Sequence, residues 1–320
     1  MENNNNSFEK NIRPITFDDY IGQSEVKENI KIFVKAALMR NETLDHTLLY
    51  GPPGLGKTTL AYIIASEMSA DIKTVSGPSI EKAGDLASVL SSLEKGDILF
   101  IDEIHRLPKF VEELLYSAME DYSLDIIIGS EGQTRSIKID LPPFTLIGAT
   151  TKAGNLSSPL RDRFGITCKL NYYTDQELKD IVKRTSKVMG INISDESALE
   201  VAKRSKKTPR IANKLLKRIS DYALVEGKTD INIKIVLSSF DKLKVDSKGL
   251  EEVSTDYLMS IINKFNGGPV GIDAISSSIG EETSTIEDLI EPYLLQEGYI
   301  KRTSRGRIVT DRTYKYFKLK

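Results

Sequence analysis

The chain has 320 residues, 28% of them charged and 40% hydrophobic, which predicts a globular protein of two or three domains. A single cysteine excludes an internal disulfide framework and is typical of a reducing cytoplasm. No apolar run is long enough to predict a membrane span. The polar start, MENNNNSFEK, is predicted to be a frayed tail rather than a secretory signal, and the two histidines and the cysteine lack zinc-ligand spacing.

A glycine-rich loop lies between a predicted strand, HTLLY, and a predicted helix, LAYIIASEM. The loop, GPPGLGKT, fits the phosphate-binding pattern G-x-x-x-x-G-K-[ST]. Gly54 and Gly56 let backbone N–H groups turn toward an anion. Lys57 can reach the β- and γ-phosphates, the Thr58 hydroxyl can ligate Mg²⁺, and Thr59 can add a phosphate contact. A chance match in a linker is the alternative, and the flanking strand and helix disfavour it.

Two further apolar strands end in residues suited to hydrolysis. The run 98–101 leads into Asp102 and Glu103, and ligands bind at the carboxyl ends of strands in parallel sheets. Asp102 would hold Mg²⁺ through water, and Glu103 would polarise the attacking water, so the two motifs together predict nucleotide hydrolysis. The segment FTLIGAT ends in Thr150 and Thr151, where a hydroxyl could sense the γ-phosphate or simply cap the strand.

Two other segments of the first half leave alternatives open. Arg161 and Arg163 lie in SSPLRDRFG, and the pattern alone favours solvated charges over an arginine finger for the ATP of a neighbouring subunit. The segment 126–139 predicts a β-hairpin, because apolar and polar residues alternate after a Gly/Ser-rich turn. The pattern alone favours an ordinary surface hairpin over a partner-binding one.

The second half is predicted to be mainly helical. A capping box, Thr174-x-x-Glu177, begins a helix whose buried stripe includes Leu178 and Val188. After a polar linker, three helical stretches and a basic hairpin predict a winged helix. Pro292 is expected to kink the third of these helices.

The C-terminal hairpin is strongly basic. Residues 298–320 hold eight Lys or Arg and one Asp, on a chain whose net charge is −2. Lys301, Arg302, Arg305 and Arg307 surround the predicted turn, and long guanidinium side chains suit contacts with the DNA backbone. A solvated hairpin on a small domain is the alternative.

Several of these motifs occur together in a known family. GPPGLGKTTLA, FIDEIHRL, AMEDY, DLPPFTLIGATT, SSPLRDRFG, TPRIANKLLKR, GGPVGID and RTSRGR resemble the RuvB family of bacterial Holliday-junction branch-migration motors, within the AAA+ superfamily. The resemblance runs from about Ile12 to near the C-terminus. The first motif is shared by P-loop NTPases in general, whereas AMEDY and the C-terminal motifs are more specific. The chain departs from the family at Ser304, where relatives commonly have Pro, and at Thr283, where many have a basic residue.

The resemblance implies an α/β AAA+ P-loop domain with a parallel sheet over 1–173, a small helical lid over 174–245, and a winged-helix domain over 246–320. It implies a cytoplasmic hexameric ring that uses ATP, with Mg²⁺ and ADP, to pull duplex DNA at Holliday junctions in recombination and repair. RuvA would bind the 126–139 hairpin, and the RuvC resolvase is an expected further partner.

The resemblance also implies roles for single residues. Ile12, Arg13 and Tyr173 would line the adenine pocket, and Gly54, Gly56, Lys57, Thr58 and Thr59 would hold phosphates. Asp102 and Glu103 would form the acid pair, Thr151 and Arg210 the two sensors, and Arg163 the finger acting in trans. Glu120, Asp121 and Tyr122 would lie near the nucleotide at the subunit boundary, and Arg302, Arg305 and Arg307 would contact DNA.

Two other functions share the same ATPase core. One is an ATP-driven loader or switch without translocation, and the other is a transcriptional regulator whose winged helix reads base sequence. The helix before the wing, STIEDLIEPYLLQEG, is acidic and apolar, so it is poorly suited to a major groove and disfavours the regulator. The loader is disfavoured only by the C-terminal motifs.

Overall fold

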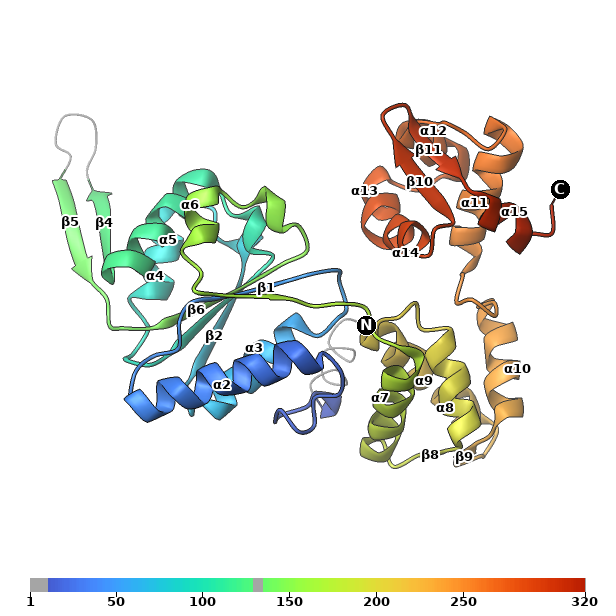
Figure 1. Cartoon of the computed structure of the whole chain (residues 1–320), viewed down its shortest axis with the longest axis horizontal. Coiled ribbons are helices and arrows are strands. Elements are labelled where there is room, and N and C mark those ends of the chain that lie inside the picture. The colour runs from blue at the N-terminus through green and yellow to red at the C-terminus, as the bar shows by residue number, and fades with distance from the viewer. Residues whose placement is uncertain (1–10, 129–134, 320) are drawn as a thin grey trace. The chain divides into compact units, whose positions relative to one another are not determined.

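The computed structural model describes residues 11–128 and 135–319 of the chain. The predicted N-terminal tail and the turn of the predicted 126–139 hairpin lie outside these residues. The chain forms two compact units, one ending at Glu177 and the other beginning at Leu178 (Figure 1). Among the described residues, no helix has the length and apolar character needed to cross a membrane.

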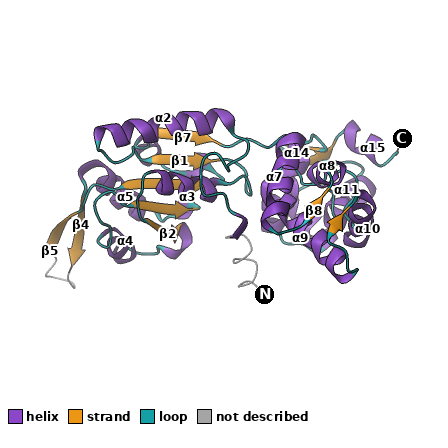
Figure 2. Cartoon of the chain, turned by 90° about the horizontal axis from the view of Figure 1, so that it is seen from below, coloured by secondary structure: helices purple, strands orange, loops and turns teal. Residues whose placement is uncertain are grey.

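A five-stranded parallel sheet, in the order β2-β3-β6-β1-β7, is the centre of the first unit. Figure 2 shows β2 and β7 at its opposite edges. The strands are β1 (Thr47–Tyr50), β2 (Ile72–Ser76), β3 (Ile98–Asp102), β6 (Thr145–Thr150) and β7 (Ile166–Lys169). The central strands β3 and β6 are buried almost throughout, as expected for strands covered on both faces. The predicted α/β class is confirmed.

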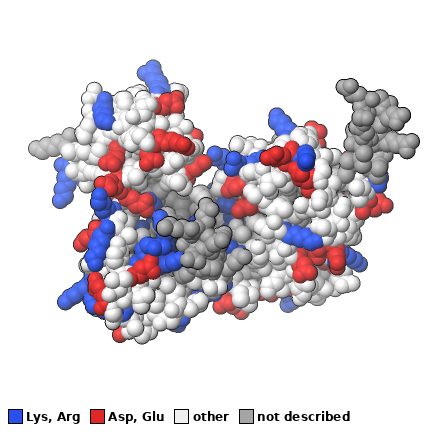
Figure 3. Space-filling view, turned by 180° about the vertical axis from the view of Figure 1, so that it is seen from behind, with Lys and Arg blue, Asp and Glu red and all other residues white. Residues whose placement is uncertain are grey.

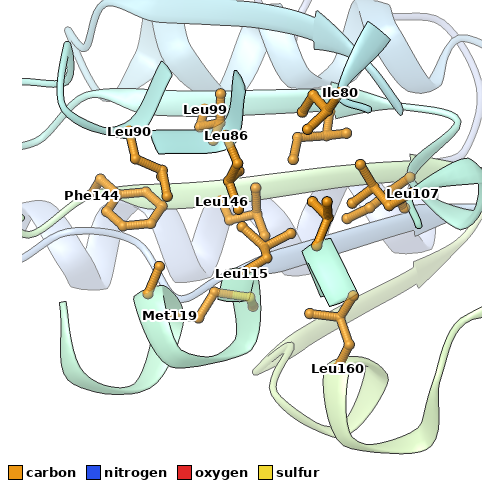
Figure 4. Packing of buried hydrophobic residues seen from close by; sticks show 14 of the residues in the cluster. Ile80, Leu86, Leu90, Leu99, Leu107, Leu115, Met119, Phe144, Leu146 and Leu160 are labelled. Atoms are coloured by element: carbon orange, nitrogen blue, oxygen red, sulfur yellow. The ribbon is translucent and has the colours of Figure 1, made fainter. Parts of the chain in front are cut away.

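Helices cover both faces of this sheet (Figure 1). The helices are α2 (Ser24–Arg40), α3 (Lys57–Glu67), α4 (Ala83–Leu90), α5 (Lys109–Asp121) and α6 (Ser158–Asp162), with 3₁₀ turns at Gly77–Ser79, Ile104–Arg106 and Ala153–Asn155. Leu86 and Leu115, from α4 and α5, pack with Leu99 and Leu146 of the sheet in the core drawn in Figure 4. This packing holds the strands in place, and the phosphate loop and the acid pair follow the carboxyl ends of these strands.

The predicted hairpin is present as an antiparallel pair. It consists of β4 (Ser123–Ile128) and β5 (Arg135–Asp140), which form a two-stranded sheet of their own. β4 directly follows α5, and the described parts of both strands extend away from the rest of the first unit in Figure 1. The sequence prediction of a hairpin is confirmed.

The second unit starts with a helical layer. Its elements are α7 (Asp175–Val188), α8 (Asp195–Lys203), α9 (Pro209–Val225), α10 (Ile233–Leu243) and two-residue strands β8 (Asn192–Ile193) and β9 (Asp230–Ile231). The capping box is confirmed, since Thr174 N donates to Glu177 Oε2 at 2.8 Å and Glu177 N to Thr174 Oγ1 at 3.2 Å. The predicted stripe is wrong at Val188, which is 49% exposed, because the helix ends there and the chain turns at Gly190.

Three helical stretches and a β-hairpin complete the second unit. They are α11 (Glu252–Phe265), α12 (Ile272–Ile279), a third stretch made of α13 (Thr283–Thr285), the π-helical turn η4 (Ile286–Ile290) and α14 (Glu291–Gln296), strands β10 (Ile300–Thr303) and β11 (Gly306–Val309), and a final helix α15 (Asp311–Tyr316). The predicted winged helix is confirmed. A π turn, in which Glu291 N donates to Ile286 O, directly precedes Pro292, and the kink expected there stays a prediction.

Removal of Leu115 should destabilise the first unit strongly. Leu115 is fully buried in the core, and a Leu→Ala change at such a position costs about 2–5 kcal/mol of unfolding free energy. Leu38→Ala, at a half-exposed position of α2, should cost under about 1 kcal/mol and is the matched control. Urea denaturation followed by circular dichroism measures both, and equal losses would contradict the assigned core.

Candidate active site

The phosphate loop joins the carboxyl end of β1 to α3. Gly54 and Gly56 have φ values of 77° and 95°, a left-handed conformation that L side chains rarely adopt. The loop ends in α3, which starts at Lys57 with Gly56 as its N-cap. Thr58 and Thr59 therefore lie in the first turn of the helix, where N–H groups and the helix dipole favour an anion.

Lys57 is a buried cation within this loop. Its side chain is 7% exposed, and Nζ donates to Gly51 O at 2.8 Å and to Pro52 O at 3.0 Å. Burial lowers the pKa of the ammonium group, while the carboxylates of Glu103 and Asp102 act in the opposite direction. Because its hydrogen bonds go to neutral carbonyl oxygens, this charge suits a phosphate ligand, and the loop fits ATP.

The acid pair lies at the same edge of the sheet. Asp102 ends β3, and its Oδ1 accepts a hydrogen bond from Glu103 N at 3.0 Å. Glu103 itself has φ 50°, which is uncommon for a residue with a side chain. A residue in this region persists only where the surrounding structure holds it.

The Glu103 carboxylate is held by residues of two strand ends. Thr151 Oγ1, just beyond β6, donates to Glu103 Oε2 at 3.2 Å. His105 Nδ1 lies 3.2 Å from the same oxygen and 2.9 Å from Thr150 Oγ1. The predicted acid, Glu103, and the predicted sensor, Thr151, are therefore in direct contact, and His105 links Glu103 to Thr150.

Sequence reasoning missed two contributors to this edge. His105 stands in the quoted motif FIDEIHRL but was considered only as a zinc ligand. Gly77, after β2, has no sequence signal, yet a Cβ there would lie 2.4 Å from Glu103 O. The glycine therefore lets the neighbouring strand end approach the turn that carries Glu103.

Tyr173 lies close to the phosphate loop. Its hydroxyl donates to Leu55 O at 3.2 Å and lies 3.4 Å from Tyr20 Oη. The side chain is 3% exposed, and burial raises the pKa of Tyr173 to about 12. Tyr173 thus contacts the phosphate loop, and its role in the adenine pocket stays a prediction. A Cβ on Gly22 would lie 2.5 Å from its ring, so the N-terminal segment packs closely on Tyr173.

The other predicted adenine residues, Ile12 and Arg13, are adjacent in the chain and are not equally accessible. Ile12 is 6% exposed, whereas the guanidinium of Arg13 stacks over the ring of Tyr62 at 4.7 Å from its centroid. Tyr62 belongs to α3, the helix that begins at the phosphate loop. The segment 12–13 is therefore held against the helix that follows the loop.

Arg163 lies at the opposite edge of the sheet from the phosphate loop. It follows α6 and comes three residues before Ile166, which pairs with Thr47 at the amino end of β1. Its NH1 forms an ion pair with Glu120 Oε2 at 2.8 Å. Asp121 and Tyr122 follow Glu120 directly, and Tyr122 packs edge-on against Phe144 at 5.9 Å between ring centroids. The structure thus brings Arg163 and the predicted Glu120–Tyr122 segment together.

The remaining predicted residues belong to the second unit. Arg210 is exposed at the second position of α9, after Pro209. Arg305 is exposed at the turn of the β10–β11 wing, and Arg302 and Arg307 face each other across it. The sequence treats these two arginines alike, but the structure distinguishes them, since their side chains are 45% and 13% exposed. Both pair with carboxylates of the preceding helix.

Figure 3 shows one face of the molecule, coloured by the charge of its side chains. In both units, the described side chains drawn in Figure 3 place Lys and Arg among Asp and Glu, without one continuous basic area. Among the described residues, no three His, Cys, Asp or Glu side chains form a metal cluster. Any metal at the phosphate loop would thus depend on a hydroxyl, a carboxylate, water and the nucleotide, which is the usual mode of Mg²⁺.

The carboxyl edge of the parallel sheet carries a phosphate loop, an acid pair and a threonine, and a helical layer follows the sheet in the chain. These features define a P-loop ATPase of the AAA+ superfamily, which binds ATP and ADP. Three family profiles match: the Holliday junction DNA helicase RuvB P-loop domain over 12–170, the RuvB AAA lid domain over 173–246, and the RuvB C-terminal winged helix domain over 247–318. The chain belongs to the RuvB family of ATP-driven branch-migration motors.

Individual relatives agree over the whole chain. The Holliday junction branch migration complex subunit RuvB of Phytoplasma mali (strain AT) is 57% identical over 310 residues, covering 97% of this chain and 93% of the relative. The solved Thermotoga maritima RuvB Holliday junction branch migration motor is 51% identical, with a TM-score of 0.88 and coverage of 97% of this chain and 99% of that one. A lysine-to-arginine mutant of the same protein also gives 0.88.

Two substitutions should separate binding from hydrolysis. Glu103→Gln keeps the shape of the side chain but removes the base, so ATP should still bind while turnover falls by at least about 100-fold. Lys57→Ala should lose ATP binding, because it removes the buried cation of the loop. Phosphate release and binding of a fluorescent ATP analogue measure the two effects. Hydrolysis by Glu103→Gln at the wild-type rate would exclude Glu103 as the base.

Proposed function

We propose that this chain hydrolyses ATP to pull duplex DNA through a ring of subunits, and so moves Holliday junctions together with RuvA during recombination and repair. The observation that carries the proposal is the match to RuvB over 97% of the chain, with the phosphate loop and acid pair intact at one sheet edge. Such a motor must ignore base sequence, which backbone contacts from a basic wing allow.

Three domains would divide the work. We assign 1–173 to the large ATPase domain, 174–245 to the lid and 246–320 to the DNA-binding head. The compact units support a division near the first boundary. The winged-helix profile, which begins at residue 247, supports one near the second.

The residues at the carboxyl edge take the following roles in this proposal. Lys57 binds the β- and γ-phosphates, with Gly54, Gly56 and Thr59 contributing to the cradle. Mg²⁺, held by Thr58 and through water by Asp102, would neutralise charge on the phosphates. Glu103 orients and deprotonates water, and Thr151 reports the γ-phosphate to it through their hydrogen bond. Ile12, Arg13 and Tyr173 hold the base, and Arg210 is the second sensor.

Arg163 acts on the ATP of a neighbouring subunit. It lies beside the amino end of β1, whereas the phosphate loop leaves the carboxyl end, and four strand residues span about 13 Å. Arg163 is also partly exposed and paired with the exposed Glu120, so its guanidinium is available at a surface. This topology supports action in trans over action in cis, and Glu120, Asp121 and Tyr122 would then lie at the same subunit boundary.

Assembly and partners follow from the family. We propose a hexameric ring, RuvA bound to the β4–β5 hairpin, and the RuvC resolvase in a larger complex, all in the cytoplasm. The position of the hairpin supports the RuvA contact, because β4 and β5 form a sheet separate from the ATPase sheet. A partner bound there would leave the phosphate loop accessible.

Branch migration on a synthetic four-way junction tests the function directly. The wild-type chain with RuvA and ATP should convert the junction to duplex products, and omission of RuvA should slow this markedly. Lys57→Ala is the control for ATP dependence and should give no products. ATP turnover without any strand movement, in the presence of RuvA, would instead favour a loader or switch.

Mixing of subunits tests the position of the finger. Arg163→Ala subunits should bind ATP but fail to hydrolyse it, because their neighbours offer no arginine. When Lys57→Ala subunits are added, some hydrolysis should return, since these subunits still present Arg163 to an Arg163→Ala neighbour. Phosphate release across mixing ratios is the measurement. No recovery at any ratio, with mixed assembly confirmed by crosslinking, would argue against action in trans.

A further inference from the structure

A fully buried carboxylate joins the two arms of the wing. Glu291, the first residue of α14, is 0% exposed. Its Oε1 accepts from Arg307 Nε at 2.8 Å and from the Tyr257 hydroxyl at 2.7 Å, and its Oε2 accepts from Arg302 Nε at 2.8 Å. Arg302 and Arg307 are directly opposed residues of β10 and β11. One carboxylate therefore holds a cross-strand pair of arginines.

This arrangement resolves a conflict within the hairpin. Two like charges directly opposite each other destabilise an antiparallel pair, so the arginines need a counter-charge between them. Burial alone would raise the pKa of Glu291, but the hydrogen bonds from Arg307, Tyr257 and Arg302 hold it below its ordinary value. The carboxylate is therefore ionised near neutral pH and pairs with both guanidiniums.

A second carboxylate, one turn earlier on the same helical stretch, provides a comparison. Glu287 Oε1 accepts from Arg307 NH2 at 2.9 Å and lies 3.6 Å from Arg302 NH2. Its side chain is 43% exposed, whereas that of Glu291 is 0% exposed. Glu287 lies within the π turn Ile286–Ile290, and Glu291 directly follows that turn. The helix thus presents one buried and one exposed carboxylate to the same arginines.

We propose that Glu291 is a positioning residue for DNA: it fixes the guanidiniums of Arg302 and Arg307 on the wing before a phosphate arrives. This inference rests on the proposed DNA contact of the wing. The hydrogen bonds to Glu291 use the Nε and NH2 atoms of both arginines, so NH1 of each arginine lies outside this set. Arg302, as the more exposed of the two, makes the principal phosphate contact, and Arg307 supports it.

Electrostatics and positioning predict opposite signs for the loss of Glu291. A carboxylate near a phosphate repels it, so removal of that charge alone should tighten DNA binding and steepen its salt dependence. If Glu291 positions the arginines, its loss instead restores their freedom, and ordering them again costs affinity. Immobilising one long side chain corresponds to a loss of about 2- to 10-fold. The direction of the change therefore decides between the two effects.

The experiment measures binding of the full-length chain to a short fluorescein-labelled duplex by anisotropy, over a series of salt concentrations. Glu291→Gln should bind about 2- to 10-fold more weakly for each arginine released. Glu287→Gln removes the same charge from the exposed position and should bind as tightly as wild type or more tightly. Arg302→Lys keeps the charge but not the two-nitrogen grip on Glu291, so it should also bind more weakly.

A double-mutant cycle separates positioning from simple loss of stability. If Glu291 acts through Arg302, then Glu291→Gln should have a much smaller effect when Arg302 is already alanine. A general weakening of the head would instead add to the effect of Arg302→Ala. If Glu291→Gln unfolds the head, as judged by circular dichroism, Glu291→Asp decides, since it keeps the charge and both arginines but shortens the reach of the carboxylate: weaker binding by the folded variant supports positioning, and unchanged binding overturns it.

The outcomes also distinguish this inference from the proposed function. If neither Arg302→Ala nor Arg307→Ala changes duplex binding, the wing does not bind DNA, and both ideas fail together. If those variants bind weakly while Glu291→Gln binds as well as Glu287→Gln, the wing binds DNA but Glu291 does not position it. That second result overturns the inference alone.

Discussion

The five strands of the first unit run parallel, so their carboxyl ends meet at one edge and their amino ends at the other. Because of this constraint, the polar residues of the site fall into two groups, one at each end of the strands. The phosphate loop, the acid pair, Thr151 and Tyr173 follow the carboxyl ends of β1, β3, β6 and β7. Arg163 and Glu120 lie at the amino edge. A single orientation of the sheet therefore separates the residues that hold a nucleotide from the one proposed to complete a neighbour's site.

Local patterns were sufficient to predict most of the carboxyl edge. The spacing of glycines and Lys57 and the run ending in Asp102 each describe one continuous segment, and contacts within a segment are encoded locally. His105 and Gly77 were missed as site residues because their importance depends on which strand ends become neighbours. Gly77 matters only because β2 pairs with β3. No periodicity in the sequence predicts that Gly77 packs closely against Glu103.

The wing also depends on a contact between distant segments that sequence reasoning did not predict. Sequence reasoning found the hairpin and its basic residues, and it judged the preceding helix too acidic to read a major groove. It did not find that this acidity faces the wing. Glu291 and Arg307 are 16 residues apart, and their contact depends on a π turn and on the pairing register of two short strands. Burial of a carboxylate is unfavourable without partners, so the arginines and Glu291 require one another.

If Arg163 acts in trans, the number of complete nucleotide sites depends on whether the subunits form an open row or a closed ring. When each nucleotide site is completed by a residue from the next subunit, an open row of subunits always has one site fewer than it has members. Closing the row into a ring supplies the last arginine and makes all sites equivalent. Closure of the ring would then raise ATP hydrolysis directly, without any change in the fold of a single subunit.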